Sequence, residues 1–103
     1  MNNFKSDSLL SEAESLICFY HPHPEYSMHV LLVPKAPMKD LFQIETKNSI
    51  LLWDLIATVH DLVEGMNLKE SGYRLVVNGG KYQDFPQLHF HLISGNQNQL
   101  PYA

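Results

Sequence analysis

Residues 87–95 read Gln-Leu-His-Phe-His-Leu-Ile-Ser-Gly, a segment in which polar and apolar side chains alternate with a period of two. That period is typical of a β-strand with one face in the core and the other toward solvent. We predict that three apolar side chains point into the core: Leu88, Phe90 and Leu92. Three polar side chains then share the opposite face: Gln87, His89 and His91. Because imidazole titrates near neutral pH and binds ligands through either ring nitrogen, this face is suited to a phosphate, a metal or a proton.

Two further strands are predicted before the middle of the chain. Residues 16–20 form the first, and the His-Pro-His-Pro run after them ends it because proline lacks an N–H and restricts the residue before it. Residues 28–33 form the second, which Pro34 ends. Its two faces are His29, Leu31 and Val33 on one side and Val30 and Leu32 on the other.

The strongest helical pattern lies in residues 47–64, where apolar residues recur at the i, i+3, i+4 and i+7 spacing of one buried stripe. The predicted stripe is Leu52, Leu55, Ile56, Val59, Leu62, Val63 and Met66. Thr46 is the predicted N-cap and Gly65 the predicted end. On this helix Trp53 is predicted to pack and His60 to lie at the surface.

Residues 73–77 are predicted to form a third strand, followed by a turn at residues 78–80 and a loop at residues 81–86. Strands therefore flank one long helix. This order predicts an α+β fold, in which a meander sheet carries the helix on one face.

The length and composition fit a single domain spanning residues 1–103. We expect the polar residues 1–8 to be disordered and residues 96–103 to form a short tail.

The formal net charge of −4 argues against a nucleic-acid polymer as partner, because such binding needs a basic surface. The lone Cys18, predicted to be buried, cannot form an internal disulfide, and no signal peptide is recognised, so we expect a cytoplasmic protein. No apolar run is long enough to span a bilayer, so no membrane partner is expected.

His21 and His23 flank prolines in a loop, where histidines are usually solvated. Four other polar candidates lie in the segments around the predicted histidine strand: His29, Asn78, Gln83 and Asp84. An antiparallel sheet can bring several of them together. One interpretation is a metal site, because a His-x-His pair on a strand suits zinc, copper or iron when a third ligand comes from elsewhere. The possible third ligands are His21, His23, His29 and Asp84, none of which has a diagnostic spacing.

The other interpretation is nucleophilic catalysis on a phosphoryl group. An imidazole can attack phosphorus and form a covalent intermediate, which water then cleaves. The attacking nitrogen must be unprotonated, and a hydrogen bond to the other ring nitrogen fixes that tautomer. Neighbouring donors must stabilise charge on the phosphoryl oxygens, and a second imidazole two residues along the strand can act as one of them.

Several segments together resemble the histidine triad (HIT) family of nucleotide hydrolases and transferases. Its hallmark is three histidines that alternate with apolar residues before a small or glycine-rich pair, and residues 87–95 match this frame with Gln87 in the first histidine position. Residues 29–35, His-Val-Leu-Leu-Val-Pro-Lys, resemble the family's strand from a histidine to a Pro-Lys. Residues 72–78, Gly-Tyr-Arg-Leu-Val-Val-Asn, resemble a further family segment, and residues 18–21 fit the strand before both. The resemblance covers residues 9–95.

The resemblance implies a HIT-like fold: about five mostly antiparallel strands with one long amphipathic helix packed on the sheet. It implies that His89 is the nucleophile that attacks the α-phosphate and that His91 contacts the phosphoryl oxygens. His29 matches a further histidine that supports the triad, and Asn78 matches a polar residue beside the phosphate. With Asn78, the residues predicted to bind the phosphate or the nucleotide are Gln83, Asp84 and His21.

At three positions the chain departs from the family pattern. Gln87 replaces the first histidine, but it still supplies the backbone carbonyl that orients the nucleophile in the family. Asp84 lies where the family often has Ser or Thr near the leaving group. His21 lies where the nucleoside phosphoramidase branch usually has an acidic residue that binds the ribose hydroxyls.

The implied activity is that of a nucleotide phosphohydrolase or nucleotidyl transferase. It would cleave at the α-phosphate of a nucleoside phosphoramidate or dinucleoside polyphosphate through a covalent His89 intermediate, without a metal or other cofactor. The expected partners are a small-molecule nucleotide and a second copy of the chain, in a homodimer. Two alternatives remain open: a non-catalytic nucleotide-binding module, and a metal-binding protein that uses the His-x-His strand.

Overall fold

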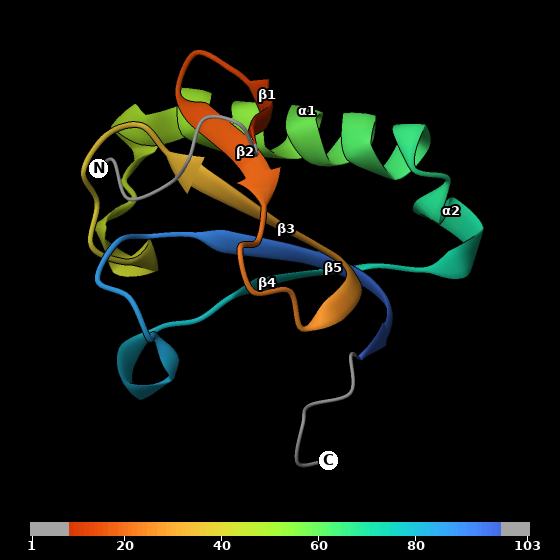
Figure 1. The fold of residues 1–103 in the computed structure, drawn as a ribbon. Helices are drawn as coiled ribbons and strands as arrows, with labels where there is room; N and C mark the ends of the chain where they lie inside the picture. Colours follow the sequence, from red (N-terminus) through yellow and green to blue (C-terminus); the bar gives the residue numbers. More distant parts are fainter. Residues whose placement is uncertain (1–8, 98–103) are drawn as a thin grey trace.

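A computed structural model describes residues 9–97 and shows a five-stranded sheet with a long helix along one side (Figure 1). The strands are β1 (Leu9–Glu12), β2 (Leu16–Tyr20), β3 (Tyr26–Pro34), β4 (Arg74–Val77) and β5 (Phe90–Gln97). The helices are α1 (Ser49–Gly65) and α2 (Leu68–Ser71), and the 3-10 turns are η2 (Leu41–Gln43), η3 (Thr46–Asn48) and η4 (Gly80–Tyr82). This architecture confirms the predicted fold class.

The strand order is β1-β2-β3-β5-β4, and each neighbouring pair is antiparallel. The simple meander predicted from the sequence is therefore wrong, because β5 lies between β3 and β4. The reason is burial: Leu88, Phe90 and Leu92 are all buried, so this segment takes a central position. The shorter and more exposed β4 is left at the edge of the sheet, where fewer backbone groups need partners.

Both ends of the described chain extend the sheet beyond what periodicity predicted. β1 was not predicted, because most of its residues are exposed and it forms only by pairing with β2. At the other end β5 continues through Gln97, so the predicted tail does not begin at residue 96. The expected disorder of residues 1–8 lies outside the described residues.

The helix α1 is rotated relative to the predicted stripe. Its buried residues are Leu51, Leu55, Thr58, Val59 and Val63. Leu52 and Ile56 are 43% and 45% exposed, and Trp53, predicted to pack, is 72% exposed. The predicted N-cap is also wrong, since Thr46 belongs to η3 and Asn48 is the cap, whereas the end at Gly65 is confirmed.

The two faces of the sheet form separate apolar clusters. Side chains from β2, β3 and β5 pack beneath α1, including Cys18, Val30 and Leu32. Phe19, Leu31 and Val33 cluster on the other face, which confirms the predicted alternation in β3. Cys18 is buried as predicted, and burial raises its pKa to about 11, so the thiol stays protonated. Within residues 9–97, no helix is both long and apolar enough to cross a membrane.

Candidate functional site

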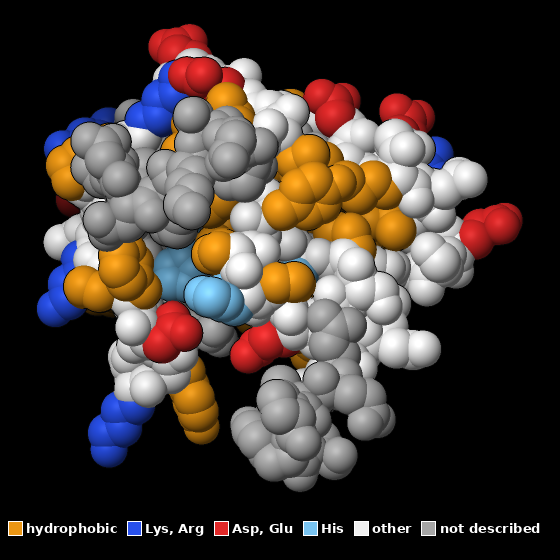
Figure 2. Space-filling model, in the orientation of Figure 1, with side chains coloured by type: hydrophobic (Ala, Val, Ile, Leu, Met, Phe, Trp, Pro, Cys, Tyr) orange, Lys and Arg blue, Asp and Glu red, His pale blue; other side chains and the backbone are white. Residues whose placement is uncertain are grey.

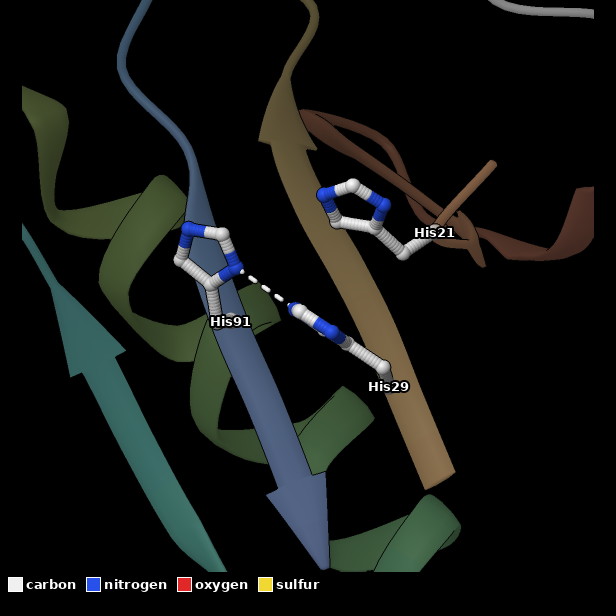
Figure 3. A group of neighbouring side chains, drawn as sticks. All are labelled: His21, His29 and His91. Atoms are coloured by element: carbon white, nitrogen blue, oxygen red, sulfur yellow. Dashed lines mark hydrogen bonds between the residues drawn. The ribbon is translucent and has the colours of Figure 1, made fainter. Parts of the chain in front are cut away.

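Four histidines meet on the face of the sheet opposite α1. His21 follows β2, His29 lies in β3, His91 lies in β5, and His89 immediately precedes β5. The ring centroids of His29 and His91 are 5.1 Å apart, and those of His89 and His91 are 5.0 Å apart. Figure 3 shows the rings of His21, His29 and His91 facing one another across neighbouring strands. In Figure 2 histidine side chains lie in a hollow of the visible face, with acidic side chains nearby.

Two hollows open beside these rings. The first has a volume of about 220 Å³ and is lined by His21, Pro22, Leu31, Asp84, Phe85, His89 and His91. The second, of about 170 Å³, is lined by Glu25, Tyr26, His29, Val76, Asn78, His91 and Ile93. His91 lines both hollows. The structure therefore brings His21, Asp84, His89 and His91 together around one hollow, and it places Asn78 in the neighbouring hollow with His29.

The ring of His89 is oriented by the main chain. Its Nδ1 lies 2.7 Å from the carbonyl oxygen of Gln87. A carbonyl oxygen only accepts, so Nδ1 carries the proton and Nε2 of the neutral ring holds a lone pair. The His89 side chain is only 10% exposed, and its Nε2 lies 3.8 Å from Oδ1 of Asp84. This ring is therefore held in the tautomer that a nucleophile requires.

Residues 87–89 are not part of β5, so the prediction that the strand begins at residue 87 is wrong. They are held instead by the segment before η2, since the N–H of Leu88 donates to the carbonyl of Met38 over 2.7 Å. The predicted alternation persists without strand pairing, because Leu88 stays fully buried between two half-buried polar residues.

A hydrogen bond from His29 fixes the tautomer of His91. The backbone N–H of Glu25 donates to Nδ1 of His29 over 3.0 Å, so the proton of the neutral His29 ring is on Nε2. This Nε2 lies 2.9 Å from Nδ1 of His91, to which it donates (Figure 3). With Nδ1 accepting, the neutral His91 ring carries its proton on Nε2. His91 therefore offers an N–H donor to the site.

Burial favours the neutral form of His21, His29 and His91. Burial first and the neighbouring imidazoles second lower the pKa of His29 and the pKa of His91 to about 4. Burial also lowers the pKa of His21, while the nearby carboxylates of Glu25 and Asp84 raise it. At neutral pH these three rings thus act through hydrogen bonds rather than through positive charge.

Two glutamines have roles that the sequence pattern did not predict. The side-chain amide of Gln83 donates to the carbonyls of Lys39 and Phe85, at 2.7 and 2.9 Å, so it braces the loop that carries Asp84. Gln83 does not line the first hollow. The Gln87 side chain donates to the adjacent carbonyl of Leu88 at 3.5 Å, and only its backbone oxygen contacts the His89 ring. Sequence spacing carries no signal for either set of main-chain contacts.

His21, His29 and His91 each offer a ring nitrogen within 4.8 Å of the others, which is close enough to be tested as a metal site. A metal takes the lone pair of a neutral imidazole, whose other nitrogen then carries the proton. In His21 and His29, however, Nδ1 accepts a backbone hydrogen bond, so Nε2 is protonated. The cluster is therefore better suited to bind a ligand that accepts hydrogen bonds than to bind a metal ion.

Comparison with known proteins agrees with this geometry. The HIT domain model matches residues 3–98. An uncharacterised HIT-like protein of Helicobacter pylori is 32% identical over 93 residues, covering 88% of this chain and 86% of its own length.

Solved structures share the fold. A HIT-like protein superposes with a TM-score of 0.74 at 33% identity, over 86% of both chains. A HIT family hydrolase from Legionella pneumophila Philadelphia 1 superposes with a TM-score of 0.80 at 26% identity, over 93% of this chain and 88% of its own. A HIT family hydrolase from Clostridium thermocellum superposes with a TM-score of 0.78 at 28% identity, over 92% of this chain and 84% of its own. The chain therefore belongs to the HIT domain family.

Proposed function

We propose that this protein is a hydrolase or nucleotidyl transferase that cleaves at the α-phosphate of a nucleoside phosphoramidate or dinucleoside polyphosphate. One observation carries the proposal: the Gln87 carbonyl holds Nδ1–H of His89 and leaves the Nε2 lone pair in the first hollow. The Nε2–H of His91 supports it, because a donor beside the reacting phosphorus stabilises charge on its oxygens.

The reaction has two balanced steps. The Nε2 lone pair of His89 attacks phosphorus, a P–N bond forms, and the leaving group departs with its electron pair and takes a proton from solvent. Water then attacks phosphorus, the P–Nε2 bond breaks, and the electron pair returns to His89. The products are the nucleoside monophosphate and the released amine or nucleotide, and the water's proton passes to solvent. No metal or other cofactor takes part in either step.

The decisive experiment compares wild type with His89→Ala on AMP and GMP phosphoramidates and dinucleoside polyphosphates, with and without chelator. Loss of the nucleophile should lower kcat/KM by roughly 10³-fold or more, since the other three histidines of the described site already use the Nδ1 lone pair in a hydrogen bond. His60→Ala is the matched control, because His60 is an exposed histidine on α1 outside the first hollow. Undiminished turnover by His89→Ala would overturn the mechanism.

Gln87 provides a complementary test of how the nucleophile is oriented. Only its backbone oxygen contacts His89, so Gln87→Ala and Gln87→His should both retain most of the wild-type kcat/KM, with histidine equal to or above glutamine. A decrease in kcat/KM for Gln87→Ala as large as that for His89→Ala would show that the Gln87 side chain, and not its carbonyl, orients the His89 ring.

A second candidate function is a nucleotide-binding module without turnover. The observation that favours it is Asp84, whose carboxylate lies 3.8 Å from Nε2 of His89, where an ionised group repels an incoming phosphate. Calorimetry with AMP, together with the substrate series above, separates the two functions. Binding of AMP without cleavage of any AMP conjugate would select the binding module.

A further inference from the structure

His21 is held in the first hollow by its own loop. Its backbone N–H donates to the carbonyl of His29 over 2.9 Å, which fixes the point where the chain leaves β2. Its ring lies 4.3 Å from that of His29 and stacks at 6.0 Å on that of His91, centroid to centroid. The ring is therefore positioned by three contacts, although it lies outside any strand.

The loop also fixes the tautomer of His21. The backbone N–H of His23 donates to Nδ1 of His21 over 2.9 Å, so the proton of the neutral ring is on Nε2. The ring therefore has no free lone pair to accept from a ligand hydroxyl, and its N–H makes a stronger hydrogen bond to an anionic phosphate oxygen than to the oxygen of a neutral hydroxyl. What His21 offers to the hollow is an N–H donor, as His91 does.

We propose that His21 is a phosphate-binding residue of this hollow, in which its Nε2–H donates to an anionic phosphate oxygen beside the donor of His91. The ligand class is a phosphorylated small molecule that is recognised at His21 through phosphate oxygen rather than through a hydroxyl group. The inference rests on the proposed function in one respect: it takes the phosphoryl group to lie against His89.

Both carboxylates and imidazoles surround the His21 ring. Glu25 in the turn before β3 and Asp84 in the loop before β5 are the carboxylates that act on the ring, and His23 and His89 are the neighbouring imidazoles. Asp84 lines the same hollow, so two N–H donors there offset the repulsion between its carboxylate and a phosphate. A metal ion at this position would instead need lone pairs that the backbone hydrogen bonds occupy.

His21→Asn tests the proposal with little disturbance to the loop. The asparagine oxygen can still accept from the His23 N–H in place of Nδ1, whereas the Nε2–H donor is lost. Calorimetry at pH 7.5 should show affinity for AMP reduced about 10-fold or more, the usual value for a hydrogen bond to a charged group. Affinity for adenosine, which lacks the phosphate, should change less than about twofold, and His60→Asn should match wild type for both ligands.

Three results would overturn the inference. AMP affinity unchanged in His21→Asn would show that the donor makes no contact, and an equal loss for AMP and adenosine would show that His21 acts on the nucleoside or on the structure of the loop, not on the phosphate. One equivalent of zinc bound by wild type from ZnCl₂ and lost in His21→Asn would show that the ring presents a lone pair. AMP binding needs no turnover, so this experiment remains decisive even if His89→Ala proves as active as wild type.

Discussion

Individual residues in the site derive their chemistry from the main chain. Carbonyl or N–H groups of Gln87, His23 and Glu25 contact Nδ1 of His89, His21 and His29, respectively. A carbonyl contact exposes a lone pair on the far nitrogen, whereas an N–H contact exposes a donor. The same kind of side chain therefore presents a lone pair at one position and a hydrogen-bond donor at another, and a pattern of histidines in sequence cannot distinguish the two.

The same burial makes stability depend on pH. In the folded protein the pKa of His29 and of His91 is about 4, below the unfolded value of 6.5. The unfolded chain therefore binds more protons between these values, so stability is complete above about pH 6.5 and is lost as pH falls toward 4. Thermal unfolding followed from pH 7.5 to 4 should show Tm falling across this window. The Tm of His29→Asn should fall less steeply with pH than the Tm of His60→Asn. Equal slopes would contradict the assignment of this pH dependence to His29.

At the scale of elements, the pairing of β3 with β5 carries the site, since it brings His29 opposite Ile93 and Leu31 opposite His91. The register shifts between Tyr26 and Met28, near the end of β5. Gly95 lies there with φ +84°, and a Cβ built on it would be 2.7 Å from Cβ of Ser27. Glycine is thus required both for its backbone conformation and for the close approach of the two strands.

Gly95→Ala should consequently destabilise the fold by about 1–3 kcal/mol, because it adds a clash to an unfavourable φ. Urea denaturation measures this change. Ser27→Gly in the same chain removes the clashing Cβ and should recover part of the loss, while the conformational strain at residue 95 remains. A stability for Gly95→Ala equal to that of wild type would show that the strands separate here at no cost.

At the scale of the whole molecule, an apolar surface remains uncovered where α1 meets the edge of the sheet. Asp54 of α1 accepts from Ser15 in the turn between β1 and β2, so this flank of the helix faces that turn. Ile56, two residues or about 200° further around the helix, lies on the opposite flank. Leu75 of β4 pairs with the buried Leu92, so it lies on the face that α1 covers, yet it stays exposed.

The expected homodimer remains a prediction, and this surface is the place to test it. Ile56→Glu puts a charge beside Leu52 and Trp53, which are exposed one helical turn earlier on α1, so sedimentation equilibrium should show a dimer in wild type and a monomer in the variant. Tyr82→Glu is the control, because Tyr82 is an exposed aromatic residue of η4. A monomeric wild type would contradict the prediction.

The sequence predicts most where side-chain periodicity decides the structure. Strand 16–20, the faces of β3 and the core residues of the last strand agree with prediction because burial alternates there. Prediction fails where tertiary contacts decide: β1 depends on β2, and Leu52 and Ile56 are exposed because α1 buries a different face, which carries Leu51, Leu55 and Val59. The residues of the first hollow were mostly anticipated, but the backbone contacts that set each tautomer join positions that no sequence motif relates.

The brace formed by Gln83 has a consequence for the order of events in folding. Its amide joins Lys39 across a separation of 44 residues, and the Leu88–Met38 hydrogen bond closes nearly the same loop, which contains α1 and β4. Closing a loop of this length costs entropy that only later contacts repay. We therefore expect the segment before β5 to dock late, after α1 has collapsed onto the sheet. Catalytic competence would then be acquired in the final stage of folding, and partially folded chains would be chemically inert.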